Sequence, residues 1–184
     1  KKNPFGKSGD FITSPLVSNL FAEMLAIWCV AFWEHVGKPR KILLVELGPG
    51  DGSLCRDLLK TFQRFKNFYN SLEISLLEIS DKLKKIQKTK INNRKVKWIK
   101  KIKEINWGPV IFLGNEFFDG LPIKQIYKKK KLFFEKYVAL SNNKKIRFVH
   151  KKANNGLIKR IQNLNLISSD STIEYPVEAL KFLE

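Results

Sequence analysis

Residues 42–52 read ILLVELGPGDG, and this stretch decides the fold predicted for the chain. Its first half, 42–47, is nearly all apolar, which is the pattern of a strand buried on both faces of a sheet. Gly48, Gly50 and Gly52 follow at once. A strand that turns sharply into a helix needs residues without a Cβ atom, so that backbone can approach a ligand closely. The stretch therefore predicts a buried strand that ends in a ligand-binding turn.

The rest of the chain alternates between apolar runs and segments with helix signals. The runs predict strands over residues 42–47, 72–77, 96–99, 110–113 and 133–140, with 144–150 as a hairpin partner of the fifth. Cap signals and periodicity predict helices from Pro15 to about Val36, from about 53 to 65 and over 81–89. Alternating strands and helices indicate an α/β fold with a mainly parallel, doubly wound sheet, whose ligand site lies beyond the carboxyl ends of the strands.

No internal repeat and no low-complexity linker divides the sequence, so we expect one continuous domain. Within it, residues 1–41 are expected to form an N-terminal loop and helix that pack on a core of residues 42–184. The chain has no initiator Met, and residues 179–184 have the pattern of the middle of a helix. We therefore expect a fragment whose core is truncated at the C-terminus.

The composition is that of a basic globular protein. The chain has 184 residues, 43% of them hydrophobic and 12% aromatic, which is enough for one domain with a substantial core. Its formal net charge is +18 and its pI is about 9.9. Such a charge attracts nucleic acid, anionic lipid or acidic protein surfaces. The lysines are scattered over many segments, however, which favours a lysine-rich surface over a dedicated binding patch.

Cysteine and histidine usage argues against disulfide and metal frameworks. Cys29 and Cys55 both sit in apolar stretches with a helical pattern, so a reducing compartment is expected. His35 and His150 are far apart, and no Cys/His cluster has metal-ligand spacing, so no dedicated metal site is expected. Residues 16–33 are apolar but include polar Ser, Asn and Glu side chains, which predicts a buried or partly buried helix rather than a membrane span.

The glycine turn has the wrong spacing for a dinucleotide site. Such a fingerprint would place its third glycine at position 53, which is Ser53 here, and no phosphate loop with a Gly-Lys pair is present. Glu46, near the strand end, suits a ligand with cationic sulfonium and ammonium groups better than a pyrophosphate. The turn therefore favours S-adenosylmethionine, with a purely structural glycine turn as the alternative.

An acid also stands at the end of the second predicted strand. Glu78 follows the run at 72–77, where a carboxylate can accept hydrogen bonds from a ribose diol. The alternative is that Glu78 caps the next helix or is merely solvated. Ser80 is itself a plausible N-cap, so the two interpretations can coexist.

Residues 113–122, LGNEFFDGLP, follow the fourth predicted strand at the mouth of the expected site. The Asn115 side chain can accept from an amine, while Glu116 and Asp119 can hold and orient a guanidinium or ammonium substrate. The adjacent aromatics are not explained by core packing alone. The alternative is a loop whose aromatics fold back onto the sheet.

Four stretches together resemble the MidA-like methyltransferase family, whose mitochondrial members are complex I assembly factors that methylate protein arginine. The matching motifs are G-D-F-x-T-S-P at 9–15, E-L-G-P-G-x-G-x-L at 46–54, L-x-E-x-S at 76–80 and N-E-F-F-D-x-L-P at 115–122. The last box is the most specific. The chain departs from the family at residues 16–18, which read LVS where Glu-Ile-Ser is usual.

The resemblance implies a Rossmann-like class I methyltransferase that uses S-adenosyl-L-methionine. It assigns the site as follows: the turn at Gly48, Pro49, Gly50 and Gly52 cradles the methionine part of the cofactor beside Glu46, Glu78 holds the ribose hydroxyls, Asp10 and Thr13 close the site from the N-terminal side, and Asn115, Glu116 and Asp119 are the candidate catalytic residues that bind the acceptor guanidinium. Trp98 or Ile99 could cover the adenine.

By this resemblance the chain is a protein-arginine methyltransferase that acts on a respiratory complex I subunit or a bacterial counterpart. Two alternatives stay open. The charge of +18 and the basic run at 128–131 suggest an RNA methyltransferase, and a third hypothesis is a cofactor-binding assembly factor with little catalysis. A bacterial cytoplasm fits the Lys/Asn/Ile-rich composition, and a mitochondrial matrix fits the family's eukaryotic members. The acceptor protein and the oligomeric state are not predicted.

Overall fold

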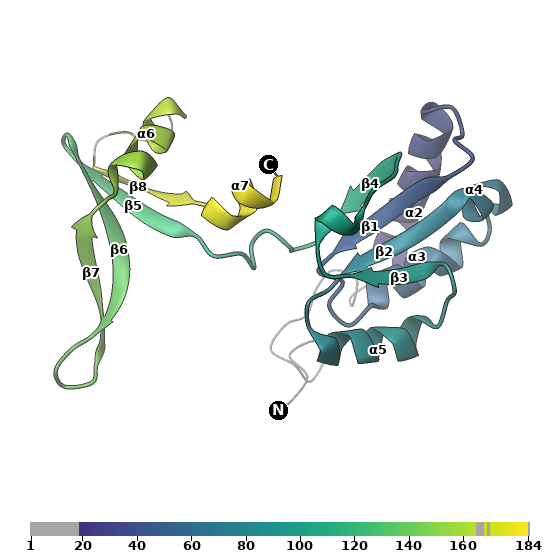
Figure 1. Ribbon diagram of the computed structural model, residues 1–184, viewed down its shortest axis with the longest axis horizontal. Helices are drawn as coiled ribbons and strands as arrows, with labels where there is room; N and C mark the ends of the chain where they lie inside the picture. Colours follow the sequence, from purple (N-terminus) through teal and green to yellow (C-terminus); the bar gives the residue numbers. More distant parts are fainter. Residues whose placement is uncertain (1–18, 165–167, 169, 184) are drawn as a thin grey trace. The chain divides into compact units, whose positions relative to one another are not determined.

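A computed structural model describes residues 19–164, 168 and 170–183 and divides the chain into two compact units, Lys1–Phe117 and Phe118–Glu184 (Figure 1). The predicted organisation, residues 1–41 packed on a core of residues 42–184, stays a prediction. The helix α2 (Asn19–His35) belongs to the same unit as the parallel strands that follow it.

The first unit is a parallel sheet with helical connections. Its strands have the order β3-β2-β1-β4, and every neighbouring pair is parallel. After α2 its elements are β1 (Ile42–Leu47), α3 (Ser53–Phe62), α4 (Lys66–Ser71), β2 (Leu72–Leu77), α5 (Asp81–Ile91), β3 (Val96–Ile99), the 3-10 turn η1 (Ile102–Glu104) and β4 (Val110–Leu113). The four strands have the predicted bounds, which confirms the α/β, mainly parallel fold class. The structure ends α3 three residues earlier than predicted and extends α5 by two.

The order of the strands places a topological switch beside β1. The chain passes from β1 to β2 and β3 on one side, and then returns to add β4 on the other. Leu47 pairs with Leu77 of β2, and Glu46 pairs with Leu113 of β4. In open parallel sheets ligands bind at such a switch, beyond the carboxyl ends of the strands. The glycine turn and residues 114–117 both follow these ends.

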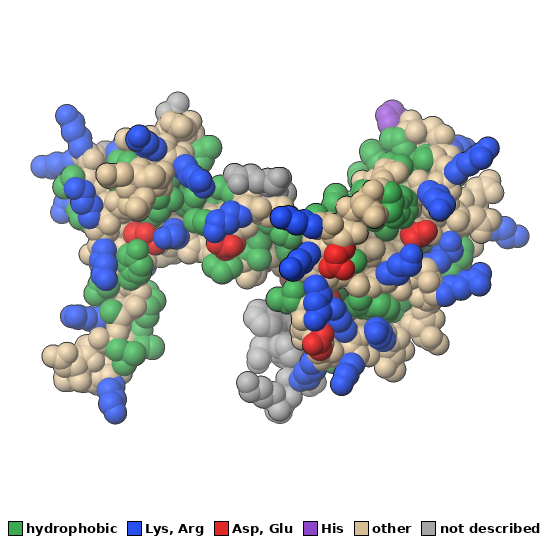
Figure 2. All heavy atoms as spheres, viewed as in Figure 1, with side chains coloured by type: hydrophobic (Ala, Val, Ile, Leu, Met, Phe, Trp, Pro, Cys, Tyr) green, Lys and Arg blue, Asp and Glu red, His purple; other side chains and the backbone are tan. Residues whose placement is uncertain are grey.

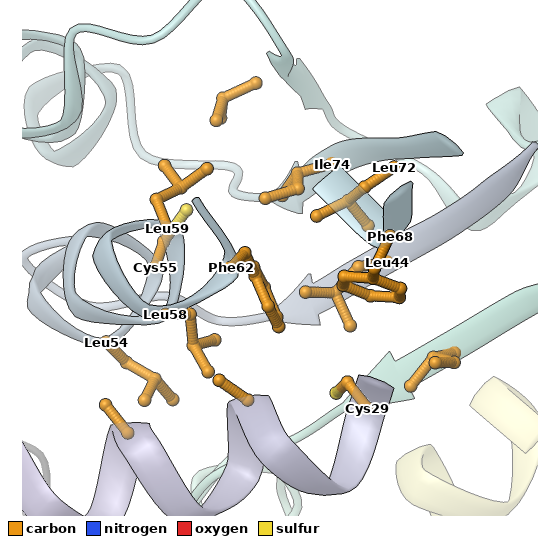
Figure 3. Packing of buried hydrophobic residues seen from close by; sticks show 14 of the residues in the cluster. Cys29, Leu44, Leu54, Cys55, Leu58, Leu59, Phe62, Phe68, Leu72 and Ile74 are labelled. Carbon is orange, nitrogen blue, oxygen red and sulfur yellow. The ribbon is translucent and has the colours of Figure 1, made fainter. Parts of the chain in front are cut away.

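The core of the first unit lies between the sheet and its helices (Figure 3). All six residues of β1 are buried, as expected for a strand covered on both faces. Phe62 of α3 and Phe68 of α4 pack with ring centroids 5.0 Å apart. Cys29 and Cys55 are free thiols in α2 and α3, as their helical pattern predicted, and burial raises the pKa of Cys29 to about 12. Both therefore act as small apolar core residues.

The helix α2 is partly buried. Ala22, Ala26 and Cys29 are buried in the core, whereas Met24 and Trp28 are more than half exposed. No helix in the described part of the chain is both long and apolar enough to cross a membrane. The prediction of a partly buried helix is confirmed from residue 19 onward, and its predicted start at Pro15 lies outside the described residues.

The second unit is an antiparallel sheet with strand order β7-β6-β5-β8. Its core contains Ile126, Phe133 and Tyr175, against which the helices pack. The elements are β5 (Lys124–Lys129), β6 (Leu132–Leu140), β7 (Ile146–Lys152), α6 (Asn155–Asn163), β8 (Ser171–Tyr175) and α7 (Val177–Leu183).

The hairpin predicted for residues 133–140 and 144–150 is confirmed, because β6 and β7 pair antiparallel. The placement of 133–140 as a fifth strand of the parallel sheet is wrong. A turn of two residues, Lys130 and Lys131, joins β5 to β6, and so short a connection permits only antiparallel pairing.

Candidate functional site

The carboxyl edge of the parallel sheet is held together by backbone hydrogen bonds that continue past the strands. The Gly48 amide donates to the Leu77 carbonyl at 3.2 Å, and the Glu78 amide donates to the Ile99 carbonyl at 3.0 Å. The first residues after β1 and β2 are therefore fixed relative to one another. These residues belong to the two motifs that the sequence assigns to the cofactor.

The glycine turn has left-handed backbone at Gly48, Gly50 and Gly52, with φ values of 62°, 56° and 82°. For a residue with a Cβ atom, this backbone conformation costs about 1–2 kcal/mol relative to the right-handed one. A Cβ atom at Gly48 would also lie 2.9 Å from Cδ2 of Phe117, and one at Gly52 would lie 3.0 Å from Cδ1 of Ile91. Pro49, between the first two glycines, is buried. The turn thus requires glycine both for its backbone and for its close contacts.

Glu46 is the buried acid at this turn. It is 4% exposed, and its Oε2 atom has no hydrogen-bond partner among the residues that the structure describes. Burial, with a smaller contribution from the charge of Asp51, raises the pKa of Glu46 to about 8. A buried carboxylate without a partner is costly, because the ionised form loses its hydration. A cation at this position would relieve that cost.

Asp51 is the opposite case at the same turn. Its carboxylate accepts hydrogen bonds from the Ser53 amide at 2.9 Å and from the Lys90 ammonium of α5. Although burial alone would raise the pKa of Asp51, these hydrogen bonds and the charge of Lys90 lower it. Asp51 is therefore ionised at neutral pH and ties the start of α3 to the end of α5.

Glu78 is buried directly after β2. Its Oε1 accepts a hydrogen bond from the Ser80 amide at 2.7 Å, and its Oε2 accepts one from Nε2 of Gln87 at 3.0 Å. Ser80 caps α5 by accepting from the Leu83 amide at 3.3 Å, as predicted. Each carboxylate oxygen can accept a further hydrogen bond, so the local role of Glu78 leaves capacity for a ribose diol.

Residues 114–117 run from the end of β4 to the glycine turn. Leu113 pairs with Glu46, and the ring of Phe117 lies against Gly48, so Asn115 and Glu116 lie between these two contacts. Asn115 is half-buried, whereas Glu116 is exposed and has a left-handed φ of 54°. Phe117 therefore covers the turn, which agrees with the alternative that an aromatic of this loop folds back.

Comparison with known proteins identifies the family. A family model described as "Putative S-adenosyl-L-methionine-dependent methyltransferase" matches residues 24–184. The chain belongs to this family. Membership confirms the resemblance seen in the motifs, and it makes S-adenosyl-L-methionine the cofactor of the family, as the glycine turn predicted.

Curated relatives of this methyltransferase family carry a more specific name. The chain is 36% identical to protein arginine methyltransferase NDUFAF7, mitochondrial, of Xenopus tropicalis, over 68% of this chain and 35% of the relative. It is 32% identical to the Homo sapiens protein of that name, over 80% of this chain and 40% of the relative. The chain thus spans about two fifths or less of the length of these relatives.

A solved structure supports the methyltransferase fold. A Burkholderia thailandensis protein in complex with S-adenosyl-homocysteine superposes with a TM-score of 0.79 and 23% sequence identity, covering 98% of this chain and 48% of that one. A second structure of a protein from that organism gives a TM-score of 0.76. The likeness confirms the Rossmann-like fold predicted for the chain.

The residues at the carboxyl edge fit the cofactor of this family. Its sulfonium and ammonium groups are cationic, and such a charge would favour the ionised form of the buried Glu46 carboxyl, whose Oε2 has no partner among the described residues. Among the described residues, no group of three or more His, Cys, Asp or Glu side chains could hold a metal ion. The buried Glu46 carboxyl is suited to a cationic organic ligand.

The structure brings together most, but not all, of the residues predicted for this methyltransferase site. Glu46 lies in β1, and the glycine turn, Glu78, Asn115 and Glu116 come after β1 and its two neighbouring strands, β2 and β4. Asp119 is exposed and belongs to the second unit, so the structure does not group it with them. Asp10 and Thr13 lie outside the described residues. The roles of all these residues remain predictions.

Sequence reasoning missed Gln87, which is buried and contacts both cofactor motifs. The signal that could have found it is its spacing on α5, where Leu83, Gln87 and Ile91 stand four residues apart on one helical face. Trp98, a candidate for covering the adenine, donates its indole N–H to Oε1 of Gln87 at 2.9 Å. This contact neither supports nor contradicts the adenine role.

Proposed function

We propose that this chain is the cofactor-binding part of a methyltransferase that transfers a methyl group from S-adenosylmethionine to arginine of a protein, such as a respiratory complex I subunit. The observation that carries the cofactor assignment is the buried Glu46 carboxyl beside the left-handed glycine turn, whose Oε2 has no partner among the residues that the structure describes. The name protein arginine methyltransferase of the curated relatives supports the acceptor. Their mitochondrial names also support the matrix over a bacterial cytoplasm.

The residues of the chain would divide the work as follows. When bound, S-adenosylmethionine supplies a methyl group already activated by its sulfonium, so the protein's tasks are orientation, exclusion of water and handling of charge. Backbone at Gly48 and Gly50 would hold the methionine part, and Glu46 would face its positive charge. The Glu78 carboxylate would accept from the ribose hydroxyls. Phe117 would shield the turn from water.

The acceptor side would use the loop after β4. An arginine guanidinium is protonated at neutral pH and presents several N–H donors in one plane. The Glu116 carboxylate would accept from these donors and stabilise the charge. The role of Asp119, which belongs to the second unit, stays a prediction from the sequence. The Asn115 side-chain oxygen would accept from the nitrogen that takes the methyl group. This division leaves the guanidinium oriented toward the glycine turn.

The distribution of charge favours protein over RNA as the acceptor. On the face drawn in Figure 2, Lys and Arg side chains are spread over both units rather than gathered into one patch. The basic run that suggested RNA, residues 128–131, forms the end of β5 and a hairpin turn. A dedicated RNA site needs clustered phosphate contacts.

We expect protein, not RNA, to become labelled when the full-length protein is incubated with cell lysate and S-adenosylmethionine that carries a radioactive methyl group. Acid hydrolysis of the labelled protein should release methylated arginine. Label in RNA would overturn the protein acceptor. If neither pool is labelled while S-adenosylhomocysteine still binds in calorimetry, the assembly-factor alternative replaces the enzyme.

Replacing the candidate acceptor residues should impair methyl transfer without impairing cofactor binding. We expect Asn115→Ala and Glu116→Gln each to lower kcat roughly a hundredfold, the usual effect of removing one preorganised polar group from a reacting centre. The Kd for S-adenosylhomocysteine should stay within about twofold, since neither side chain is assigned to the cofactor. The matched control is Glu34→Gln, which removes an exposed carboxylate paired with Lys38. Equal loss in the control would contradict the assignment.

A further inference from the structure

Gln87 lies on α5 in full burial, with 0% of its surface exposed, although α5 is rich in lysine. A buried amide is tolerated when its donors and acceptor are satisfied. Gln87 is distant in sequence from the glycine turn and nine residues from Glu78, yet it contacts both in the folded chain. Its Cγ would lie 3.2 Å from a Cβ at Gly52, so the helix packs tightly against the turn.

Three hydrogen bonds fix the Gln87 amide. Its Nε2 donates to the Gly50 carbonyl at 2.7 Å and to Oε2 of Glu78 at 3.0 Å, and its Oε1 accepts from Nε1 of Trp98 at 2.9 Å. The reverse orientation of the amide would place its oxygen against two acceptors and its nitrogen against an indole donor. One orientation is therefore strongly favoured, and the amide links the glycine turn, the end of β2 and β3.

The consequence for Glu78 is that its carboxylate is held from both sides. The Ser80 amide donates to Oε1 at 2.7 Å, and Gln87 donates to Oε2 at 3.0 Å. Because both carboxylate oxygens are already held, the Glu78 side chain would lose little freedom when a diol binds. The same amide also holds the carbonyl of Gly50, a residue assigned to the methionine part of the ligand.

We propose that Gln87 is a positioning residue of the cofactor site, which couples the glycine turn to the Glu78 carboxylate and so sets the affinity for the adenosyl part of the ligand. This inference rests on the proposed use of S-adenosylmethionine. Gln87 is assigned no contact with the ligand, and it acts through Gly50 and Glu78.

The test uses the full-length protein and its Gln87→Met variant, in which a side chain of similar length has no hydrogen-bonding amide. We expect the Kd for S-adenosylhomocysteine, measured by calorimetry, to rise about tenfold. The kcat at saturating S-adenosylmethionine should stay within about threefold, because the acceptor loop is untouched. The matched control is Phe68→Leu in α4, which opens the core at a helix that contains none of the assigned site residues and should lower Tm without changing this Kd.

A second ligand distinguishes positioning from general damage to the fold. The analogue of S-adenosylhomocysteine with a 2′-deoxyribose lacks one hydroxyl that Glu78 would bind. We expect the wild type to bind this analogue more weakly than S-adenosylhomocysteine, and Gln87→Met to discriminate less between the two. Gln87→Glu, which keeps the shape but places a second carboxylate beside Glu78, should weaken binding further than Gln87→Met.

The outcomes separate the two proposals. Wild-type Kd values and wild-type discrimination in a folded Gln87→Met variant would overturn the positioning role and leave the cofactor assignment standing. A wild type that binds no S-adenosylhomocysteine would overturn the cofactor assignment itself, and the positioning role with it. Retained discrimination with a weaker Kd would show that Gln87 supports the fold and does not act through Glu78, which also overturns the inference.

Discussion

Replacing Gly48 with alanine should abolish detectable methyl transfer by the full-length protein and raise its Kd for S-adenosylhomocysteine by at least about tenfold. The new Cβ would lie 2.9 Å from Cδ2 of Phe117, at a position whose φ of 62° already disfavours a side chain. The aromatic ring is rigid, so the turn or the 114–117 loop must move to accept it. Either movement displaces groups assigned to the cofactor. Calorimetry and a methyl-transfer assay measure the two losses.

The matched control for this change is Gly37→Ala. Gly37 has a φ of 87°, but a Cβ there would meet no heavy atom of the described residues within 4 Å. Both variants should lose about 1–2 kcal/mol of stability from the left-handed backbone. The contact with Phe117 distinguishes them, so only Gly48→Ala should lose ligand binding. Adding Phe117→Ala to Gly48→Ala should restore part of the affinity. Equal binding losses in both single variants would show that the contact is irrelevant.

The parallel sheet was predictable because its signals are local. β1 and β2 are largely apolar runs that are buried almost throughout, which keeps their pattern continuous. β3 and β4 are four residues each and partly exposed, but each is bounded by turn residues. The second sheet was predictable only at its hairpin, β6 and β7. The strand β5 reads KQIYKK and β8 reads STIEY, and both are largely polar. They pair with each other although β6, β7 and α6 lie between them in the sequence, and no local sequence pattern indicates such a pairing.

The candidate site divides in the same way. The glycine turn and Glu78 could be found from sequence, because special backbone and an acid at a strand end leave a motif. Gln87 shares a helical face with Leu83 and Ile91, but a glutamine in a helix that reads DKLKKIQKTKI does not itself show which groups it contacts. Its burial depends on how α5 packs on the turn. The burial of Glu46 is likewise a property of the packed site, since the sequence shows only an acid near a glycine.

Glu46→Gln should make the protein more stable than the wild type at alkaline pH and about equally stable in acid. The pKa of Glu46 is raised from 4.5 to about 8, by burial first and by the charge of Asp51 second. The folded state therefore holds a proton that the unfolded state releases between these pH values. In the wild type, the contribution of Glu46 to the free energy of unfolding is therefore largest below about pH 4.5. This contribution falls by about 1.4 kcal/mol per pH unit as the pH rises to about 8.

Glutamine cannot titrate, so the Glu46→Gln variant should not show this decline in the free energy of unfolding. The quantity to measure is the difference in unfolding free energy between Glu46→Gln and wild type, from urea unfolding at about pH 5 and about pH 9. Taking the difference cancels the groups that titrate in both proteins. The exposed, paired Glu34 provides the control, and Glu34→Gln should show no such growth between the two pH values.

The ligand adds a second, opposite effect at the same residue. A cation beside Glu46 favours the ionised carboxylate, so S-adenosylmethionine should stabilise the wild type more at about pH 8 than at about pH 6, and this gain should be absent in Glu46→Gln. The ammonium group of the ligand also loses its proton as the pH rises, but this change is the same in the experiments with wild type and with Glu46→Gln. If the ligand stabilises the two proteins to the same extent at both pH values, Glu46 does not face the positive charge of the cofactor, and the assignment of the glycine turn to its methionine part loses its main support.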